Sequence, residues 1–578
     1  MSTTGASSTD EVTRAVLRHR FDSIADGMER ALVRTSYSNI VKEAEDASSA
    51  IFDPEGRTIA QAVATPSHLG MLIPAVRRIV ERFPPDEMAK DDVYAMNDPY
   101  QGGTHLPDFT VVKPIFSDGD VIALGATMSH HTDVGGTTPG SIPTDATDIY
   151  QEGIRIPPVK LYDQGEPNET FLETIRKNTR APDNFMGDLN AQISACSYAA
   201  SRMRDVAREY GTDVIVTVIE DLMTYAERLT RSAFEDIPDG TYEFHDFLDD
   251  DGIHHHEPIR IQVAVEIDGS DVHVDFTGTA DQVDGPVNSV PAATISAVYF
   301  AIRMITGPDI PTNSGCFEPV SVHLPERSLV NPAPPSPVNA RTVTISRIGD
   351  VVLGAFAQAI PDESRAASKT PVTVLSFGRT TEGNSWVYGE ILPGGMGARP
   401  TKDGVDALDA DISNCKNTPV EATELENPLR VTEFSLWDDS GGPGEYRGGL
   451  GCRKRIQARM DGIVFTHRRD RHDTGPWGLQ GGEEAPKCKT TIFRTDGTAE
   501  SIPSKYVCEL NEGDEVDLFM TGGGGYGAPT DRPLDSVATD VKRGKVSRDV
   551  ASDRYGIVFD DDGTIDREQS DETRTSAV

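Results

Sequence analysis

The sequence lacks paired cysteines and long apolar runs, and each absence excludes a class of protein. Its six cysteines are scattered singly along 578 residues, without a Cys-x-x-Cys pair. We therefore expect neither a structural zinc site nor a disulfide-stapled domain. No stretch of about 18 apolar residues is present, so no transmembrane helix is predicted. The first residues are polar and acidic, without the apolar stretch of a secretory signal, which predicts a cytoplasmic protein.

Basic residues are also scarce. Lysine and arginine number 54 against 93 aspartates and glutamates, giving a formal net charge of −39. Nucleic acids and anionic membranes bind basic patches, so neither is expected as a partner. An acidic surface could bind a cationic partner. However, the acids are spread along the chain and arginine outnumbers lysine, a haloarchaeal-type composition that favours solubility at very high salt.

Common nucleotide-binding and nucleophile motifs are missing as well. The glycine run 521–527 lacks the Lys-Ser/Thr ending of a P-loop, and residues 441–451 do not match the dinucleotide-binding pattern. We interpret both as tight turns between strands. No Gly-x-Ser-x-Gly sequence marks a nucleophilic serine, although a triad could still assemble in space. The sequence thus predicts no ATP site of its own.

Hydrophobic periodicity predicts an α/β (mixed α+β) fold, with a helix-and-strand N-terminal catalytic region packed on a β-rich C-terminal region. Helical spacing occurs in residues 11–36, 70–83, 183–210, 214–233, 292–306 and 348–360. Strand patterns occur in residues 49–61, 111–116, 121–126, 259–265 and 272–276.

The composition and hydrophobic pattern of the chain change near residue 238 and again near residue 530, which suggests four segments. Residues 1–10 are expected to be a disordered lead-in. Residues 11–237 would form an N-terminal α/β region with a metal site, and residues 238–529 a β-rich mixed region that completes the cleft. Residues 530–578 are strongly charged with few aromatics, and we expect an acidic, mobile tail.

The densest polar segment, residues 97–108, holds candidate metal ligands. Its glycines and prolines prevent a regular helix, so it must form a shaped loop. His105 and Asp108 are three residues apart, a spacing that can direct an imidazole and a carboxylate to one centre. After a strand-like segment, residues 129–136 add His130, His131 and Asp133. This donor mix suits Mn²⁺, Fe²⁺ or Zn²⁺, which could lower the pKa of a bound water or polarise a carbonyl.

A purely structural role for these histidines remains an alternative. A histidine near an aspartate is more often a hydrogen-bonded structural pair than a ligand pair. Two glycine-flanked, histidine-bearing loops close in sequence raise metal binding to an equal alternative. The run His254-His255-His256 follows three aspartates and a glycine, and we interpret it as a solvated turn.

Ordered sequence blocks resemble the hydantoinase B/oxoprolinase family. That family includes the B-type component of N-methylhydantoinase, the C-terminal half of 5-oxoprolinase, and the large subunits of acetone and acetophenone carboxylases. The matching blocks run nearly end to end: Lys42-Glu43 and residues 50–53, 97–108, 130–136, 139–141, 150–160, 275–279, 394–399, 417–421, 439–442, 476–479 and 521–527.

The resemblance implies a hetero-oligomer with divided labour. A hydantoinase A-type ATPase partner would use ATP to phosphorylate the amide or enol oxygen of the substrate, and this chain would act on the activated species. A divalent metal, manganese or alternatively iron or zinc, would be held by four ligands: Glu43, His105, Asp108 and His130. Glu45 could replace Glu43, because the flanking residues depart from the family pattern. His131 and Asp133 would orient a ligand or act as the base.

The implied function is ATP-dependent hydrolysis of a cyclic amide: a hydantoin, an N-methylhydantoin or 5-oxoproline. A five-membered lactam is a poor electrophile, so phosphorylation of its oxygen would make attack by water easier. The alternative is the large subunit of an ATP-dependent acetone- or acetophenone-type carboxylase. A third possibility is an assembly scaffold that has lost its chemistry. The resemblance does not name the substrate, because the shape of the pocket decides that.

Overall fold

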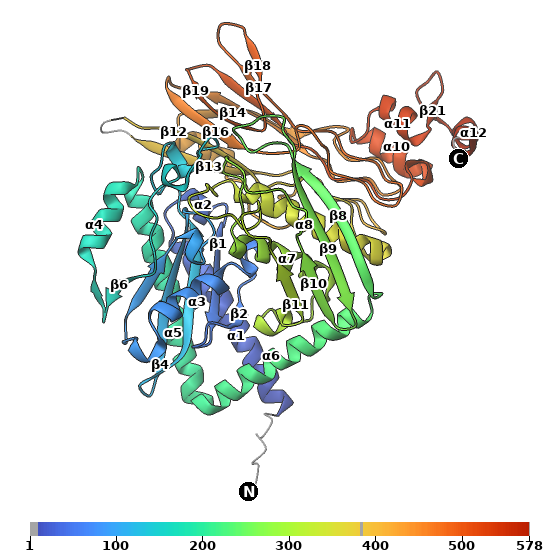
Figure 1. Cartoon of the computed structure of the whole chain (residues 1–578). Helices are drawn as coiled ribbons and strands as arrows, with labels where there is room; N and C mark the ends of the chain where they lie inside the picture. Colours follow the sequence, from blue (N-terminus) through green and yellow to red (C-terminus); the bar gives the residue numbers. More distant parts are fainter. Residues whose placement is uncertain (1–9, 382–384, 577–578) are drawn as a thin grey trace.

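An antiparallel sheet forms the centre of the N-terminal part in the computed structural model, which describes residues 10–381 and 385–576 (Figure 1). Its strand order is β2-β1-β5-β4-β3-β6-β7. The strands are β1 (Ala47–Phe52), β2 (Thr58–Gln61), β3 (Val93–Met96), β4 (Asp108–Ser117), β5 (Asp120–His130), β6 (Val159–Asp163) and β7 (Glu166–Pro167). β4 and β5 are buried over most of their length, because helices cover both faces of the sheet.

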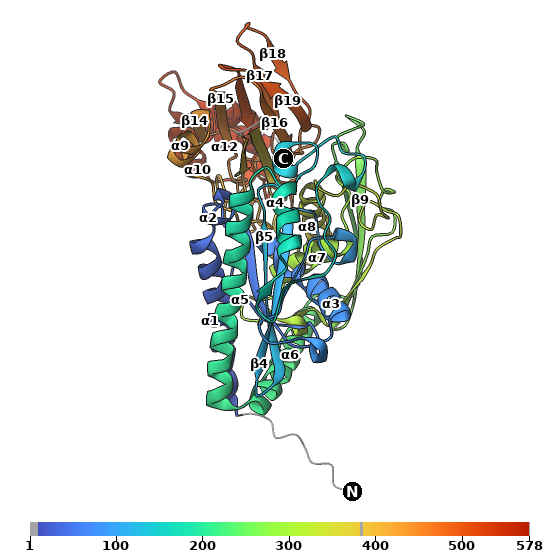
Figure 2. The same cartoon turned by 90° about the vertical axis from the view of Figure 1, so that its left-hand side faces the viewer.

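Two long helices, α1 (Glu11–Thr35) and α5 (Pro182–Tyr210), run side by side along one face (Figure 2). Helix α3 (Leu72–Arg82) packs on the other face. Asp10 caps the start of α1, and its carboxylate accepts a hydrogen bond from the backbone N–H of Thr13 at 3.0 Å. Apolar side chains recur every three or four residues and form its buried stripe: Leu17, Phe21, Ile24, Met28 and Leu32. The helix predicted at the start of the chain is confirmed.

A second sheet, with the order β11-β10-β9-β8, packs against helices of the middle of the chain. Its strands are β8 (Gly240–Leu248), β9 (Ile259–Asp268), β10 (Asp271–Asp275) and β11 (Val320–His323), and the helices are α6 (Thr212–Glu235), α7 (Pro291–Ile305) and α8 (Arg341–Ala359). α8 begins at Arg341, whereas the sequence predicted a start at residue 348. The prediction was late because buried polar residues interrupt the apolar pattern of the first turns. One hydrophobic core includes residues on both sides of position 238.

Two further sheets make the C-terminal part β-rich, with the orders β13-β12-β16-β19 and β14-β15-β20-β17-β18. Their strands are β12 (Thr373–Arg379), β13 (Trp386–Leu392), β14 (Leu429–Leu436), β15 (Cys452–Ala458), β16 (Ile463–Arg468), β17 (Lys489–Phe493), β18 (Ala499–Ser501), β19 (Lys505–Leu510) and β20 (Glu515–Phe519). A second core, which includes Phe377, Ile456 and Val516, draws on both sheets. The predicted mixed fold, with a β-rich C-terminal region, is confirmed.

Glycine-rich segments pack backbone against backbone in this part of the chain. The N–H of Gly449 donates to the carbonyl of Met396 at 2.8 Å, and the N–H of Gly523 donates to the carbonyl of Gly449 at 3.0 Å. A Cβ atom on Gly523 would lie 2.0 Å from the Met396 carbonyl oxygen. The sequence predicts tight turns here. The structure instead has buried segments that bond to one another, which explains why so many positions are glycine.

Buried ion pairs join the two cores. Arg347 in α8 contacts Asp246 in β8 at 2.9 Å and Asp470, two residues after β16, at 2.6 Å. Arg471 also contacts Asp246, at 3.1 Å. Removing one partner from such a network leaves an unpaired buried charge, which is strongly destabilising. The network therefore holds the second sheet and the C-terminal strands in one arrangement.

The segment after residue 530 is folded, which corrects the prediction of a mobile tail. It contains α10 (Leu534–Lys542), α11 (Arg548–Tyr555), β21 (Val558–Phe559), β22 (Ile565–Asp566) and α12 (Arg567–Ser576), at the red end of Figure 1. A small core consists of Val537, Val546, Ala551, Tyr555 and Ile557. Arg532 contacts Asp403 at 2.7 Å and Asp540 at 2.8 Å and so ties the segment to the main body. The high average charge of the segment concealed these few apolar positions.

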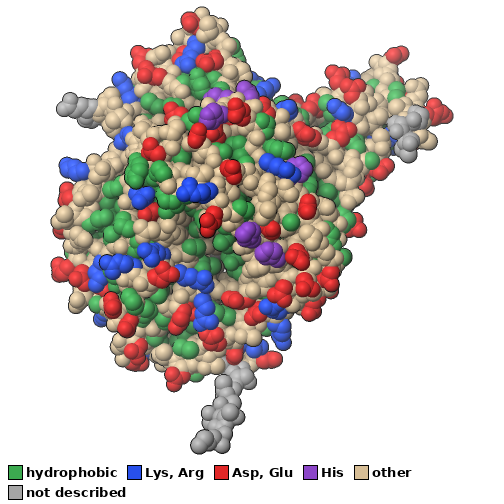
Figure 3. Space-filling model, in the orientation of Figure 1, with side chains coloured by type: hydrophobic (Ala, Val, Ile, Leu, Met, Phe, Trp, Pro, Cys, Tyr) green, Lys and Arg blue, Asp and Glu red, His purple; other side chains and the backbone are tan. Residues whose placement is uncertain are grey.

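Acidic side chains are spread over the face of the molecule in Figure 3 rather than gathered in one patch. Among the described residues, no helix is long and apolar enough to cross a membrane. The predicted disordered lead-in falls on residues 1–9, which lie outside the described residues, and on Asp10, which caps α1.

Candidate metal centre

Strand pairing places two candidate ligands opposite each other. β4 begins at Asp108 and β5 ends at His130, and these two residues are direct partners in the antiparallel register. Directly opposed residues of an antiparallel pair have Cβ atoms about 4.5–5.5 Å apart. The two loops that the sequence singled out therefore meet at one end of a hairpin in the centre of the sheet.

His105 completes a compact, buried group with these two residues. Its Nε2 lies 2.8 Å from Asp108 Oδ1, and the Nδ1 of His130 lies 3.3 Å from the same oxygen. The ligand atoms of the three residues lie within 4.8 Å of one another, and this is the only group of that kind found among the described residues. Two imidazole nitrogens and a carboxylate oxygen fit a first-row divalent metal.

The second ring nitrogen of His105 is occupied. Its Nδ1 lies 3.1 Å from the backbone carbonyl of Asn339, to which it can donate a hydrogen bond. In histidines that bind metals, such a bond keeps the proton on one ring nitrogen and leaves the other, here Nε2, free to bind the ion. Burial, followed by the charge of Arg341, lowers the pKa of His105 to about 3, so its ring is neutral at physiological pH.

Asp108 is held in its ionised form by its surroundings. Burial alone would raise its pKa, but contacts with His105 and Arg341 outweigh this and hold the pKa well below its usual value. Its Oδ2 accepts hydrogen bonds from the hydroxyl of Thr104, at 2.5 Å, and from the guanidinium of Arg341. The centre thus offers a carboxylate on Asp108 and a neutral imidazole on His105, the protonation states that metal binding requires.

A small cavity of about 30 Å³ adjoins the centre. Polar residues that line it, beyond the three candidate ligands, are Asp46, Thr65, Ser67, His68, Arg341, Thr342, Ser413 and Arg468. The predicted ligand Glu43 is not among the lining residues. It follows directly after the short helix α2 (Asn39–Lys42). Asp46, just before β1, does line the cavity, and its Oδ1 lies 3.8 Å from His68 Nε2. The competing candidate Glu45 instead pairs with Lys416, at 2.5 Å.

The predicted base residues lie elsewhere. His131 faces α5, where its Nε2 lies 3.0 Å from Gln192 Oε1 and its ring packs 4.1 Å from that of Phe185. The carboxylate of Asp133 accepts hydrogen bonds from Arg180 and from backbone N–H groups, including that of Gly140 at 3.0 Å. Neither residue lines the cavity. This placement gives no support to the prediction that they act as the base.

Glu152 holds the backbone segment that contacts His105. Its Oε1 accepts the backbone N–H groups of Val338 and Asn339, both at 2.8 Å, and the side chain is fully buried. Asn339 in turn binds His105 through its carbonyl oxygen. Burial raises the pKa of Glu152 to about 8, although these backbone donors oppose the shift.

Replacing Glu152 with alanine is expected to lower the free energy of unfolding by about 2–4 kcal/mol, because two buried N–H groups lose their acceptor. Glu152→Gln keeps one carbonyl acceptor and serves as the matched control. Since the folded state holds a proton that the unfolded state releases, the contribution of Glu152 is full below about pH 4.5 and is lost as pH rises through 8. Thermal unfolding from pH 6 to 9 should show a steeper decline for the wild type than for Glu152→Gln. Equal declines would contradict this assignment.

The triple-histidine run lies on the surface, as predicted. The side chains of His254, His255 and His256 are 48%, 36% and 73% exposed and pair with separate aspartates. His254 lies 3.1 Å from Asp251, at the same spacing in sequence as His105 and Asp108 at the candidate centre. The three rings do not converge on one point, since each contacts a different carboxylate.

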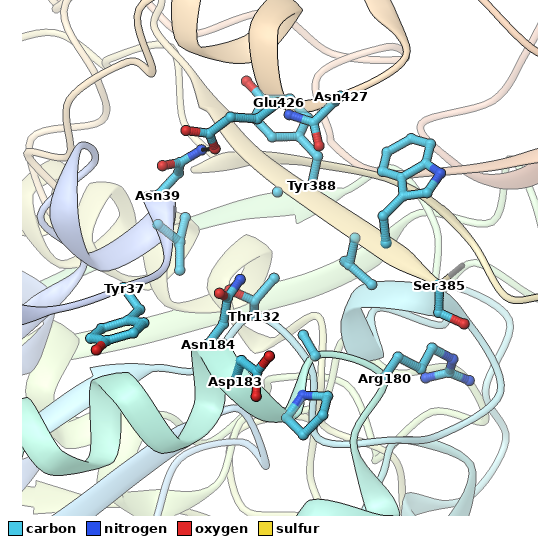
Figure 4. Close-up of a pocket in the computed structure, with 16 residues that line it drawn as sticks. Tyr37, Asn39, Thr132, Arg180, Asp183, Asn184, Ser385, Tyr388, Glu426 and Asn427 are labelled. Carbon is cyan, nitrogen blue, oxygen red and sulfur yellow. Dashed lines mark hydrogen bonds between the residues drawn. The ribbon is translucent and has the colours of Figure 1, made fainter. Parts of the chain in front are cut away.

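A larger cavity of about 340 Å³ is shown in Figure 4. Its wall is polar: Asn39 donates to Glu426 at 2.7 Å, and Tyr37, Asp183 and Asn184 lie across from them. Thr132, two residues after His130, also lines it. β13 begins in this cavity at Trp386 and reaches the small cavity at Ile391. Strand β13 therefore lines both spaces.

Sequence comparison decides the family. The chain matches the family described as hydantoinase B/oxoprolinase over residues 10–529. This chain belongs to the hydantoinase B/oxoprolinase family. Similar curated proteins include the putative B-type component of a D-/L-hydantoinase from Pseudomonas sp. (strain NS671), 34% identical over 98% of both chains. The beta component of the caprolactamase of Pseudomonas jessenii is 34% identical over 96% of this chain and 97% of its own length.

Other members of the hydantoinase B/oxoprolinase family are longer. The 5-oxoprolinase of Dictyostelium discoideum is 32% identical over 92% of this chain, but the match spans 41% of that protein. Among solved structures, the ATP-dependent caprolactamase from Pseudomonas jessenii superposes with a TM-score of 0.91, at 32% identity, over 98% of this chain and 100% of that chain. Nucleotide-free acetone carboxylase gives a TM-score of 0.90 over 98% of this chain and 83% of that chain. At 18% identity, this likeness shows a shared fold.

Several polar residues of this hydantoinase B-type centre were missed by sequence reasoning. Arg341 and Arg468 come from α8 and β16, far along the chain from the histidine loops. Asn339 acts through a backbone carbonyl, which leaves no trace in the sequence. Asp46 and His68 stand near segments that the sequence did single out, but without a spacing pattern that marks them as neighbours of His105.

Proposed function

We propose that this chain is the hydrolytic subunit of an ATP-dependent cyclic-amide hydrolase. The observation that carries the proposal is the buried group of His105, Asp108 and His130 in a chain that shares its fold with an ATP-dependent caprolactamase. Two relatives, of the hydantoinase and caprolactamase types, are named as single subunits of larger enzymes, which supports a hetero-oligomer. The partner would be a hydantoinase A-type ATPase that phosphorylates the amide oxygen.

The donor set fits a divalent metal, with manganese as the first candidate and iron or zinc as alternatives. His105, Asp108 and His130 would hold the ion, and Asp46 is the lining carboxylate that could complete the set in place of Glu43. A metal at this place supplies Lewis acidity, which polarises an oxygen of the substrate and lowers the pKa of water. Asn339 fixes the ring of His105, and Arg341 keeps Asp108 ionised.

The proposed reaction has two stages. Water adds to the ring carbon that carries the phosphorylated oxygen, the carbon–nitrogen bond breaks, and the nitrogen takes up a proton, which opens the ring and leaves an acyl phosphate. A second water then releases inorganic phosphate and leaves a carboxylate. His68 lines the cavity and its buried ring is neutral, because burial lowers its pKa, so it is placed to accept a proton from water. The larger polar cavity, which shares strand β13 with the small one, has room for the body of a small cyclic amide.

Carboxylation of a ketone is the second candidate, because acetone carboxylase has the same fold. In that reaction the metal would stabilise an enolate. Dependence on bicarbonate separates the two functions, since ring opening needs water and no carbon source.

The test uses the chain co-expressed with its ATPase partner and purified in high salt. Hydantoin, N-methylhydantoin, 5-oxoproline and caprolactam are each incubated with ATP, and the ring-opened acid and ADP are measured. We expect one substrate to be opened with ATP consumption, and removal of the metal by a chelator to lower the rate by about 100-fold or more until Mn²⁺ is returned. Incorporation of labelled bicarbonate without ring opening would favour the carboxylase. Absence of both turnover and bound metal would favour a scaffold.

A further inference from the structure

Two buried arginines line the small cavity beside the candidate metal centre. Arg341, at the start of α8, and Arg468, the last residue of β16, are only 2% and 1% exposed. Arg341 contacts Asp108. Arg468 donates from Nη1 to the carbonyl and the side-chain oxygen of Asn339, both at 2.6 Å. Two guanidinium groups therefore stand at one small space in the interior of the protein.

The cavity wall has hydrogen-bond donors left over. The Nε atoms of Arg341 and Arg468 and the hydroxyl of Thr342 are buried, and none has a hydrogen-bond partner among the described residues. All three residues line the same cavity. A buried donor without an acceptor costs about 1–3 kcal/mol, so these groups favour the binding of a ligand with several hydrogen-bond acceptors. The surplus donors indicate that the guest is an oxyanion.

The balance of charge points to the same kind of guest. Asp46 and Asp108 offset Arg341 and Arg468, and histidines that bind a metal do so in the neutral form. A divalent cation would then leave an excess of two positive charges in the interior. Uncompensated buried charge is very unfavourable. A dianion bound beside the metal restores neutrality.

We propose that Arg341 and Arg468 bind the phosphoryl dianion of the activated substrate beside the metal, an inference that rests on the proposed function. The planar fork of a guanidinium matches the oxygens of a phosphoryl group. A space of about 30 Å³ admits such a compact head and excludes a nucleotide. The two arginines thus select the phosphorylated form of the amide and hold its phosphate through ring opening.

Inorganic phosphate is the probe, and its binding to the intact, manganese-loaded chain is measured by calorimetry at constant salt. Arg468→Gln is expected to weaken phosphate binding by at least 10-fold, and Arg468→Lys by less, because the charge is kept. Thr342→Val, which removes one hydroxyl without changing charge, should weaken it by a few-fold. Arg20→Gln is the matched control, since Arg20 forms an exposed ion pair with Glu209 far from this cavity. Thermal unfolding verifies that each variant is folded.

Metal content, measured on the same samples, separates this inference from the proposed function. Variants that keep the metal and bind phosphate as tightly as the wild type would overturn the role of the arginines and leave the metal centre standing. If Arg468→Gln does not fold, Thr342→Val decides by the same criterion. If the wild type takes up no metal, the proposed metal centre fails. Phosphate binding to the metal-free chain then decides the inference, because dependence on Arg468 would support it and absence of binding would overturn it.

Discussion

Replacing both His105 and Asp108 with alanine is expected to remove the metal and to lower amide-opening activity by about 1,000-fold or more. His105 and His130 both contact one oxygen of Asp108, and the double substitution leaves His130 as the only one of the three candidate ligands. Loss of a residue that merely supports a metal ligand already costs about 10–100-fold. Elemental analysis of the purified chain should give about one manganese, iron or zinc for the wild type and none for the variant.

The pair of His254 and Asp251, in which the histidine is exposed and the aspartate is buried, provides a matched control. The two residues are three apart in sequence and 3.1 Å apart in space, like the pair at the centre, but His254 is 48% exposed. His254→Ala/Asp251→Ala should therefore keep the full metal content. The loss of Asp108 leaves Arg341 unpaired, which costs about 3–5 kcal/mol, so His105→Ala alone is the second test. A folded His105→Ala chain with full metal content and full activity would show that the site assignment is wrong.

Replacing Gly523 with alanine is expected to lower the free energy of unfolding by more than about 3 kcal/mol, or to prevent folding. The added Cβ would lie 2.0 Å from the carbonyl oxygen of Met396 and 2.4 Å from the backbone nitrogen of Gly397. Overpacking ordinarily costs about 1–3 kcal/mol when side chains can move aside. Here the obstacle is backbone, which cannot rotate away.

Thermal unfolding and soluble yield measure this effect. Gly307→Ala is the control, because a Cβ there meets nothing within 4 Å. Gly449→Ala should behave like Gly523→Ala, since its Cβ would lie 2.0 Å from the carbonyl oxygen of Val405. A Gly523→Ala protein as stable as Gly307→Ala would mean that the glycine segments are not packed as described.

Periodicity predicted the main elements because their apolar stripes are regular. Helix α1 and the strand pair β4–β5 were found from local pattern alone. The hairpin also explains why the sequence correctly predicted that His105, Asp108 and His130 lie together. Antiparallel strands joined by a short turn bring their far ends together, so two polar loops on either side of one hairpin must meet. Helix α8 was found with a late start, because buried polar residues masked its first turns.

The rest of the site depends on contacts that no local pattern encodes. Arg341 and Arg468 reach the cavity from distant elements, and their role depends on how two cores pack. The choice between Glu43 and Asp46 depends on where α2 ends, and helix ends are poorly defined by sequence. His131 was assigned to the centre because it follows His130. Successive side chains of a strand point to opposite faces. His131 therefore points towards α5, because His130 points to the candidate centre.

The pairing of β4 with β5 contains an irregularity between Ile115 and Phe116, where the register shifts by one residue. Beyond it lies only the tip of the hairpin, so a length change at the tip leaves the pairing of Asp108 with His130 intact. A deletion between that irregularity and His130 would shift the register and turn the histidine to the opposite face. Over evolutionary time, insertions and deletions should therefore accumulate at the tip. The stem should keep its length in every descendant that retains the candidate metal centre.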